Sequence, residues 1–353
     1  MPRPTGAKSS SDSGMGRSVG VVLRLMPRSV THPWARRPRV RATGERGDRS
    51  TPVAGAPVRG APEGYLPDVT RSTLGAFLLP EGYARLAPHA ALRESSVLLE
   101  ASRYAHSRAG QRRARRATAY ASRVAPRDAD PVLLVPGFLC GDLSLRPLGR
   151  VLREQGLRTY RSQIRANVGC TLDAAAELEG RLESIAQRRG SRVQLVGHSL
   201  GGMLARGIAV RRPDLVSNIV TMGSPMLAPG AHHPSLTAAV EALVRLSRAG
   251  LSGLMAEECL AGACARRSFE ESREPVPAGT GFTAIYSRRD GVVDWRACVD
   301  PLAEPVEVTA SHLGMVLDPR VIAHVVAAVR PRDVPAGRTG LASVLEVDRG
   351  ESA

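Results

Sequence analysis

The chain has 353 residues and a net charge of +16, and 43% of its residues are apolar but only 3% aromatic. This length can bury a sizeable core, which Val, Leu, Ile and Ala must build, and aliphatic runs are typical of strands in parallel sheets. Residues 1–130 hold 23 Arg or Lys against 10 Asp or Glu. Because 48 of the 49 basic residues are Arg and no nucleic-acid motif accompanies them, we attribute the charge to biased coding and expect no nucleic-acid partner.

The first 128 residues form two predicted segments. Residues 1–65 are rich in Arg, Pro, Ser and Gly without periodicity, which predicts a disordered tail. Residues 66–128 are predicted to be an N-terminal helical segment that packs on the rest of the protein; the alternative is a basic amphipathic surface that contacts anionic lipid. An apolar stripe at helical spacing consists of Leu92, Val97, Leu98, Leu99, Ala101 and Tyr104.

Export and membrane signals are not convincing. The apolar run that starts at Val19 is short and is closed by Arg24, and no hydrophobic region follows Arg36-Arg37. No stretch approaches the roughly 20 apolar residues that a membrane span needs. We therefore expect a cytoplasmic protein, with peripheral membrane contact through the N-terminal helices as the alternative.

The cysteines are few for this length and odd in number. We expect free thiols in a reducing cytoplasm. The alternative is a bridge between Cys259 and Cys264, or from either to Cys298, which would require export. The five residues are Cys140, Cys170, Cys259, Cys264 and Cys298.

Residues 129–332 alternate between strand-like and helix-like patterns, and 333–353 are predicted to be a C-terminal tail. The alternation predicts an α/β fold with a doubly wound, mostly parallel sheet. Strands are expected at 131–135, 159–164, 192–196, 218–222, 282–287 and 305–309. Helices are expected at 143–155, 172–189, 199–211, 235–248 and 319–330.

The third of these strands leads into Gly197-His198-Ser199-Leu200-Gly201, and a helix-like segment follows. A strand, Gly-x-Ser-x-Gly and a helix, in that order, form a nucleophile elbow, a sharp turn that presents the serine hydroxyl above the sheet edge. Glycine at 197 and 201 lets strand and helix approach closely. We therefore predict that Ser199 is a nucleophile.

An acid and a base follow in the chain order that this arrangement requires. The strand at 282–287 ends in a turn that contains Asp290, and the strand at 305–309 leads into a loop with His312. We predict that His312 accepts the Ser199 proton and that Asp290 orients the imidazole. Asp294 is the alternative acid.

The oxyanion hole is expected from two backbone amides. A buried strand at 131–135 runs into Pro136-Gly137-Phe138, where one such N–H group normally originates. We predict Phe138 N–H as the first donor and Leu200 N–H as the second.

From about residue 131 to 330 the chain resembles the α/β-hydrolase family, in particular its small lipase- and esterase-like bacterial members. The resemblance implies a Ser-Asp-His hydrolase with Ser199, Asp290 and His312 in those roles. Many lipases have His where this chain has Pro136, which argues against any named lipase subfamily but leaves the Phe138 amide in place. The matching segments are 136–138, 197–201, 223–225, 286–291 and 311–314.

An insertion at about 226–280 separates the fourth and fifth expected strands. It contains a helix with Leu236, Val240, Leu243 and Val244 on its apolar face. We expect a partial lid that shapes an apolar acyl pocket; the alternative is a structural excursion without gating.

Other candidate residues are expected to have no chemical role. His198 is predicted to support the elbow turn, His324 to be an ordinary helix residue, and Cys140 lacks an elbow of its own. His232-His233 has no metal-ligand spacing and is interpreted as a loop.

The sequence therefore predicts a serine hydrolase that cleaves carboxylic esters, preferring apolar acyl groups, with no cofactor and no metal. Its expected partner is a small-molecule or lipid ester substrate. The alternatives are an acyltransferase that uses the same acyl-serine, and a non-catalytic protein that binds a membrane or a partner.

Overall fold

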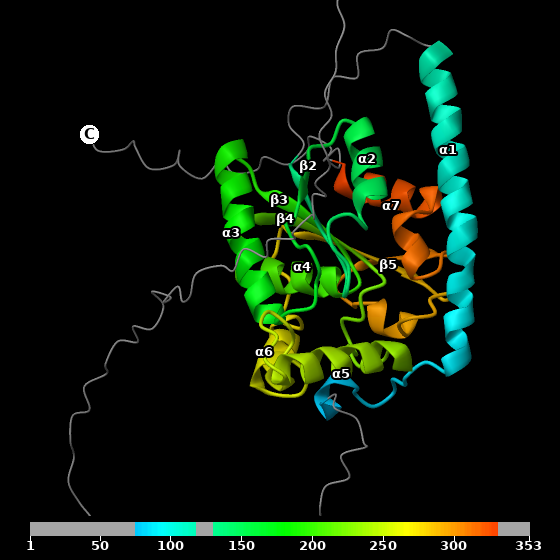
Figure 1. Cartoon of the computed structure of the whole chain (residues 1–353). Coiled ribbons are helices and arrows are strands. Elements are labelled where there is room, and N and C mark those ends of the chain that lie inside the picture. Colours follow the sequence, from blue (N-terminus) through cyan, green and yellow to red (C-terminus); the bar gives the residue numbers. More distant parts are fainter. Residues whose placement is uncertain (1–74, 118–129, 331–353) are drawn as a thin grey trace, which may run out of the picture. The chain divides into compact units, whose positions relative to one another are not determined.

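The structure is a computed structural model that describes residues 75–117 and 130–330 (Figure 1). The tails predicted at 1–65 and 333–353, and the ends of the predicted helical segment, lie outside the described residues. The N-terminal described part contains the 3-10 helices η1 (Ala76–Leu78) and η2 (Pro88–Ser96) and the long helix α1 (Val97–Ala117).

A six-stranded sheet forms the centre of the fold, in the order β2-β1-β3-β4-β5-β6. Each neighbouring pair is parallel. The predicted α/β fold is confirmed, and each expected strand lies within a few residues of an observed one. The strands are β1 (Val132–Val135), β2 (Thr159–Arg161), β3 (Val193–His198), β4 (Val216–Met222), β5 (Gly281–Ser287) and β6 (Glu304–Val308).

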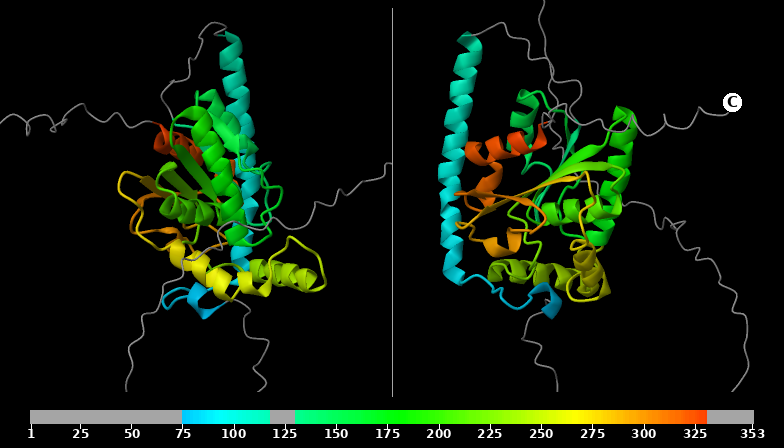
Figure 2. Two further views of the ribbon diagram at one scale, coloured as in Figure 1. Left: turned by 90° about the vertical axis from the view of Figure 1, so that its left-hand side faces the viewer. Right: turned by 180° about the vertical axis from the view of Figure 1, so that it is seen from behind.

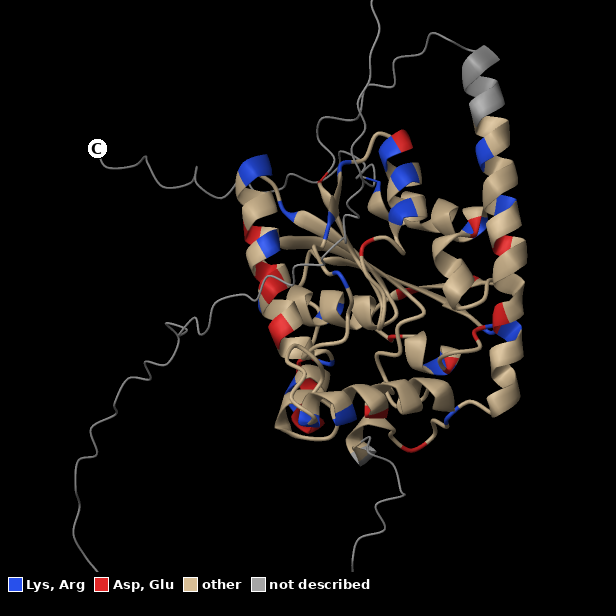
Figure 3. Cartoon of the chain, viewed as in Figure 1, with Lys and Arg blue, Asp and Glu red and all other residues tan. Residues whose placement is uncertain are grey.

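Helices cover both faces of the sheet because alternate strand residues point to opposite sides. Val132 and Leu134 pack with α2 (Arg146–Glu154) and α7 (Pro319–Val329). Leu133 and Val135 pack on the other face with α3 (Thr171–Arg189) and α4 (Leu200–Arg211). Charged residues lie mainly on the helices, whereas the strands between them carry few (Figure 3). The core is therefore aliphatic on both sides of the sheet.

The segment between β4 and β5 contains more helix than the sequence predicts. It holds α5 (Pro234–Arg248), η3 (Glu257–Cys259) and α6 (Ala263–Glu271). These helices lie at one end of the sheet (Figure 2). Side chains of all three line a cavity together with Ser199, which follows β3. A hydrogen bond from Met255 N–H to Val168 O, at 2.8 Å, ties the segment to the loop that precedes α3.

The apolar stripe of the N-terminal segment does not pack as one face. Tyr104 packs against the core next to α2 and α7. Leu92, Leu98 and Leu99 are exposed to 75%, 78% and 51%. The stripe's helical spacing therefore does not predict burial at these three positions.

None of the described helices combines the length and the apolar character needed to cross a bilayer.

Candidate active site

Ser199 stands at a strained turn between β3 and α4. Its backbone has φ 53° and ψ −125°, an arrangement that residues other than glycine rarely adopt. A Cβ atom at Gly197 would lie 2.4 Å from the backbone oxygen of Gly201, so a side chain there would push the strand and the helix apart. The Ser199 N–H donates to Met222 O at 2.8 Å, which ties the turn to the end of β4. The geometry is that of the predicted nucleophile elbow.

His312 and Asp290 form a buried pair. The distance between His312 Nδ1 and Asp290 Oδ2 is 2.7 Å. Because an ionised carboxylate only accepts hydrogen bonds, Nδ1 carries the proton and Nε2 is left free to accept another. Asp290 Oδ1 is held in turn by the N–H groups of Val292 and Val293, each at 2.8 Å.

The environment of His312 raises its pKa. Burial on its own lowers the pKa of the imidazole, but the charge of Asp290, the hydrogen bond to it and the charge of Glu94 together outweigh burial. The surroundings thus stabilise the imidazolium relative to that of a free histidine, as a base that must carry charge in a transition state requires.

The register of the sheet brings the three predicted side chains to one edge. Ser199 follows β3, Asp290 follows β5 and His312 follows β6, and the carboxyl ends of parallel strands meet at the same edge. Gly223, directly after β4, lies between them: a Cβ atom there would be 3.0 Å from His312 Nδ1 and 3.2 Å from Asp290 Oδ2. Gly223 also has a φ of +57°, so a side chain is excluded by space and by conformation. Of the hydrogen bonds that could join these three side chains, the structure contains the one between His312 and Asp290. A bond between a serine hydroxyl and an imidazole, as between Ser199 and His312, often tightens only when substrate binds.

The two predicted oxyanion donors come from two segments next to Ser199, the loop after β1 and the start of α4. Leu200 N–H is the first of α4, where helix amides have no partner within the helix. Within the described residues, no backbone acceptor is found for the N–H of Phe138 or of Leu200. A Cβ atom at Gly137 would lie 3.1 Å from Ser199 Cβ, so the loop that carries Phe138 packs against the elbow.

Asn167 holds the Phe138 loop in place. Its side-chain amide donates to Pro136 O at 2.9 Å, and its backbone oxygen accepts from Leu139 N–H at 3.2 Å. Asn167 is buried. It lies after β2 and is therefore far along the sequence from the Phe138 loop that it supports. It is therefore a positioning residue for the proposed oxyanion hole.

His198 contacts His312. Its Nε2 lies 3.0 Å from His312 O, and the two ring centroids are 4.8 Å apart. Burial and the charge of His312 lower the pKa of His198 to about 3, against the opposing effect of the hydrogen bond to His312 O. His198 is thus a neutral donor to the backbone of the His312 loop, whereas the sequence predicts that it supports the elbow turn.

Two glutamates from outside the sheet bind the loops of the acid and the base. Glu94 Oε1 accepts from Gly291 N–H at 2.8 Å and from His312 N–H at 3.0 Å. Glu100 is buried and accepts from Ser311 N–H at 3.1 Å and from the Ser311 hydroxyl at 3.0 Å. Neither glutamate could be identified from the sequence, because both lie about 200 residues from their partners and belong to no motif.

A cavity of about 130 Å³ opens beside Ser199. The segment between β4 and β5 contributes most of the lining, and the loop after β1 and the start of α4 contribute part of the rest. The lining is mostly apolar, with Thr171, His232 and Ser268 as polar members besides Ser199. The apolar members are Leu78, Phe138, Leu200, Met203, Pro225, Pro229, Leu236, Val240, Met255, Cys259, Leu260, Ala265, Phe269 and Val293.

The remaining candidates lie outside the triad. Asp294 caps η4 (Trp295–Cys298) and pairs with Arg296, with Nη2 and Oδ2 2.6 Å apart, so it is not the partner of His312. His233 caps α5 by accepting from Ser235 N–H at 3.1 Å, and His324 is exposed on α7. The 3-10 helix η5 (Leu313–Val316) follows the proposed base directly.

Residues 181–253 match the model of a family described as the PGAP1-like alpha/beta domain. None of the curated proteins matches the chain. Among solved structures, the chain is similar to the mature lipase BlEst2 of Bacillus licheniformis, with 14% identity, a TM-score of 0.47 and coverage of 60% of this chain and 95% of that one. It is also similar to carboxylesterase CesB of Bacillus subtilis, with 17% identity, a TM-score of 0.39 and coverage of 58% and 85%. It is similar as well to a monoacylglycerol lipase of Paleococcus ferrophilus, with 16% identity, a TM-score of 0.38 and coverage of 57% of this chain and 96% of that one.

The strand order, the parallel pairing and the elbow, together with the family match, show that the predicted α/β-hydrolase fold is correct.

Proposed function

Because the chain has the α/β-hydrolase fold, we propose that it is a serine hydrolase that cleaves carboxylic esters through an acyl-enzyme on Ser199. The observation that carries the proposal is a strained serine, an imidazole–carboxylate pair and two backbone amides without a backbone acceptor among the described residues, all at one sheet edge beside an apolar cavity. Each of these features has a separate role in acyl transfer.

The reaction follows from the protonation state of His312. Its unprotonated Nε2 takes the proton of the Ser199 hydroxyl while the serine oxygen attacks the ester carbonyl. The imidazolium is stabilised by Asp290, and its proton then passes to the departing alcohol. Water repeats the sequence on the acyl-serine: it gives a proton to His312, attacks the carbonyl carbon and releases the acid as Ser199 regains its proton.

Charge that develops on the carbonyl oxygen meets Phe138 N–H and Leu200 N–H. Removal of one such donor costs about 3–4 kcal/mol of barrier in a measured serine protease. Neither donor has a backbone acceptor within the described residues, so neither must break a bond of that kind to receive the oxyanion.

The cavity favours apolar acyl groups. Its lining gives an acyl chain aliphatic contacts, and among the described residues no Lys, Arg, Asp or Glu contributes to the wall. Because the segment at about 226–280 forms one side of the cavity, we propose that it acts as a partial lid over the acyl site. Deletion of 235–265 tests this role: a folded protein with unchanged ester preference would contradict it.

A panel of p-nitrophenyl esters from acetate to palmitate tests the proposed function. We expect turnover of several esters by the wild type, with a preference for acyl chains longer than acetyl, and none by Ser199→Ala above the buffer rate. A folded wild type that turns over no ester would contradict the proposal.

The second candidate function is acyl transfer from the same acyl-serine to an alcohol or amine. Addition of acceptor alcohols during turnover separates the two: new esters identify a transferase, whereas release of free acid at an unchanged rate identifies a hydrolase.

The exposed leucines 92, 98 and 99 support a proposal about location, namely contact of this N-terminal segment with anionic lipid. Co-sedimentation with phosphatidylserine vesicles tests it. Binding that weakens when all three are changed to Ser would support the proposal, and binding to neutral and anionic vesicles alike, or to neither, would contradict it.

A further inference from the structure

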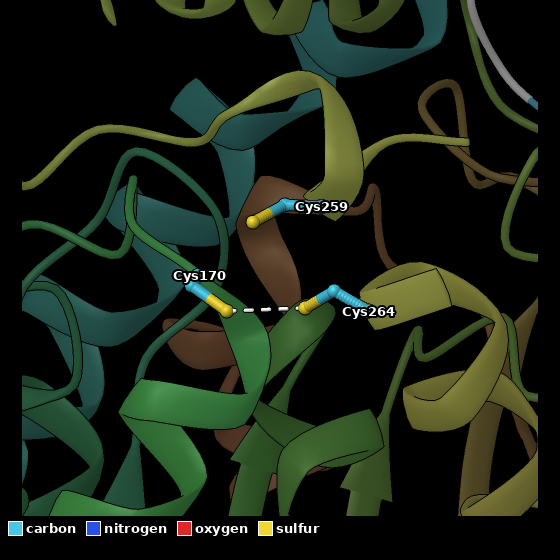
Figure 4. A group of neighbouring side chains, drawn as sticks. All are labelled: Cys170, Cys259 and Cys264. Atoms are coloured by element: carbon cyan, nitrogen blue, oxygen red, sulfur yellow. Dashed lines mark hydrogen bonds between the residues drawn. The ribbon is translucent and has the colours of Figure 1, made fainter. Parts of the chain in front are cut away.

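Three cysteines from separate parts of the chain converge beside the cavity. Cys170 precedes α3, Cys259 ends η3 and Cys264 lies in the first turn of α6. Their Sγ atoms all lie within 4.8 Å of one another, and the Cys170 and Cys264 sulfurs are 3.2 Å apart. Figure 4 shows the three thiols pointing toward one another from these elements. Because Cys170 belongs to the body and the other two to the proposed lid, the cluster joins the two parts.

We propose that Cys170, Cys259 and Cys264 bind one thiophilic metal ion, Zn²⁺ or an ion of similar softness, and so fasten the proposed lid to α3. Thiolates bind Zn²⁺ at about 2.3 Å, which places the sulfur atoms of a tetrahedral site about 3.8 Å apart. The observed sulfur separations, from 3.2 Å to within 4.8 Å, need small side-chain movements to reach that value.

The donor set selects the kind of ion. Within the described residues, no carboxylate or imidazole belongs to the cluster, so it offers three soft ligands and no hard oxygen. Soft thiolates favour Zn²⁺ and Cu⁺ over Mg²⁺ or Ca²⁺. A fourth position would be left for water or another small ligand.

The sequence predicts no metal site. It predicts free thiols, with a disulfide bridge among Cys259, Cys264 and Cys298 as the alternative. All five cysteines are free in the structure. Cys298 is buried beside Asp294, with 3.8 Å between its sulfur and the Asp294 backbone oxygen, so it does not belong to the cluster. The third member is Cys170 instead. Because it is far from Cys259 and Cys264 along the chain, the sequence does not indicate that it joins them.

The test is Zn²⁺ binding to the fully reduced full-length protein under anaerobic conditions, measured as metal retained after gel filtration. We expect one Zn²⁺ per chain in the wild type and in Cys140→Ser, and a loss of more than tenfold in affinity in Cys170→Ser and Cys259→Ser. Cobalt(II) added in place of zinc should give the intense absorption of thiolate–cobalt bonds in the wild type. Circular dichroism shows that each variant compared is folded.

Hydrogen exchange supplies a readout that does not depend on activity. Zn²⁺ should slow exchange of the backbone between 256 and 269 in the wild type and leave it unchanged in Cys259→Ser. Ser199→Ala should bind Zn²⁺ like the wild type, which separates this inference from the proposed hydrolase. The inference is overturned if the reduced, folded wild type retains no Zn²⁺, or if Cys259→Ser binds it equally well. It is also overturned if the Zn²⁺-treated protein in a glutathione buffer carries a Cys170–Cys264 disulfide instead of the ion.

Discussion

Glu94 Oε1 accepts a hydrogen bond from the backbone N–H of His312 at 3.0 Å. The same oxygen accepts from Gly291 N–H at 2.8 Å, one residue after Asp290, and Oε2 accepts from Leu313 N–H at 2.9 Å. A carboxylate from η2, outside the sheet, therefore links the loop of the proposed acid to the loop of the proposed base. Hydrogen bonds to a charged group contribute about 1.5–3 kcal/mol each, so the link is strong enough to affect the site.

Glu94→Gln should lower kcat/KM by about tenfold or more, since a shift of about 1.4 kcal/mol in the barrier is tenfold in rate. The charge of Glu94 also helps to raise the pKa of His312, so its loss should move the acidic limb of the kcat/KM profile to lower pH. Glu81→Gln, an exposed change in the same segment, is the control. A variant with the wild-type rate and the wild-type limb would show that Glu94 is only structural or irrelevant.

Asp290→Asn should lower kcat by about 10⁴, because the amide cannot hold His312 in the tautomer with Nδ1 protonated. Asp294→Asn is the matched control: it keeps the cap of η4 and should retain most of the activity. The comparison decides between the two acids that the sequence leaves open. The opposite ranking of the two variants would assign the role to Asp294.

The kcat/KM of the wild type should rise with pH through a single limb that belongs to His312. The base must be neutral to accept a proton, and its pKa is raised, so the midpoint should lie above the value of about 6.5 for a free histidine. His198 has a pKa of about 3 and stays neutral throughout, so it should add no second limb above pH 5. A midpoint below that of free histidine would contradict the arrangement around Asp290 and Glu94.

Val240→Phe should change the ester preference. Val240 is buried on α5 and lines the cavity, so a larger ring removes space for the acyl chain. We expect the ratio of palmitate to acetate turnover to fall at least about tenfold, the effect of roughly 1.4 kcal/mol. Leu246→Phe, on the exposed face of the same helix, should leave the ratio unchanged. Equal ratios in both variants would place the acyl chain elsewhere.

Arg206 and Asp300 form a buried ion pair, 2.7 Å apart, that ties α4 to the turn before β6. Asp300→Ala leaves the guanidinium buried without its partner and should lower the free energy of unfolding by about 3–5 kcal/mol. Asp214→Ala breaks the pair with Arg212, in which Asp214 is 59% exposed, and should cost less than about 1 kcal/mol. Urea unfolding of both variants measures the difference, and equal losses would show that the buried pair has no special weight.

The sheet and the elbow could be predicted from the sequence because their signals are local. The aliphatic runs at β1, β3 and β4 are buried strands, and Gly197 and Gly201 flank the serine where the strand must meet the helix. The order of acid and base along the chain is also local information. In these strands the aliphatic residues are the buried ones, as their residue types predict.

Other features could not be predicted because they depend on contacts between distant segments. Glu94 and Glu100 lie in a segment whose apolar stripe suggested ordinary packing, and nothing near them marks their bonds to the His312 loop. Helix α6 was missed because its sequence, ACARRSFEE, is short and has one large apolar side chain, Phe269, although Ala265 and Phe269 are both buried. The apolar stripe of the N-terminal segment gave the opposite error: its helical spacing predicted packing, but Leu92, Leu98 and Leu99 are exposed, because spacing alone does not say which leucines the fold covers.

Labelling with a fluorophosphonate, read by peptide mass spectrometry, tests the central claim most directly, because the probe reacts only with an activated serine. The account predicts one adduct on Ser199 in the wild type, much slower labelling in His312→Ala and none in Ser199→Ala. A folded wild type that stays unlabelled, or that carries its adduct on another residue, would contradict it.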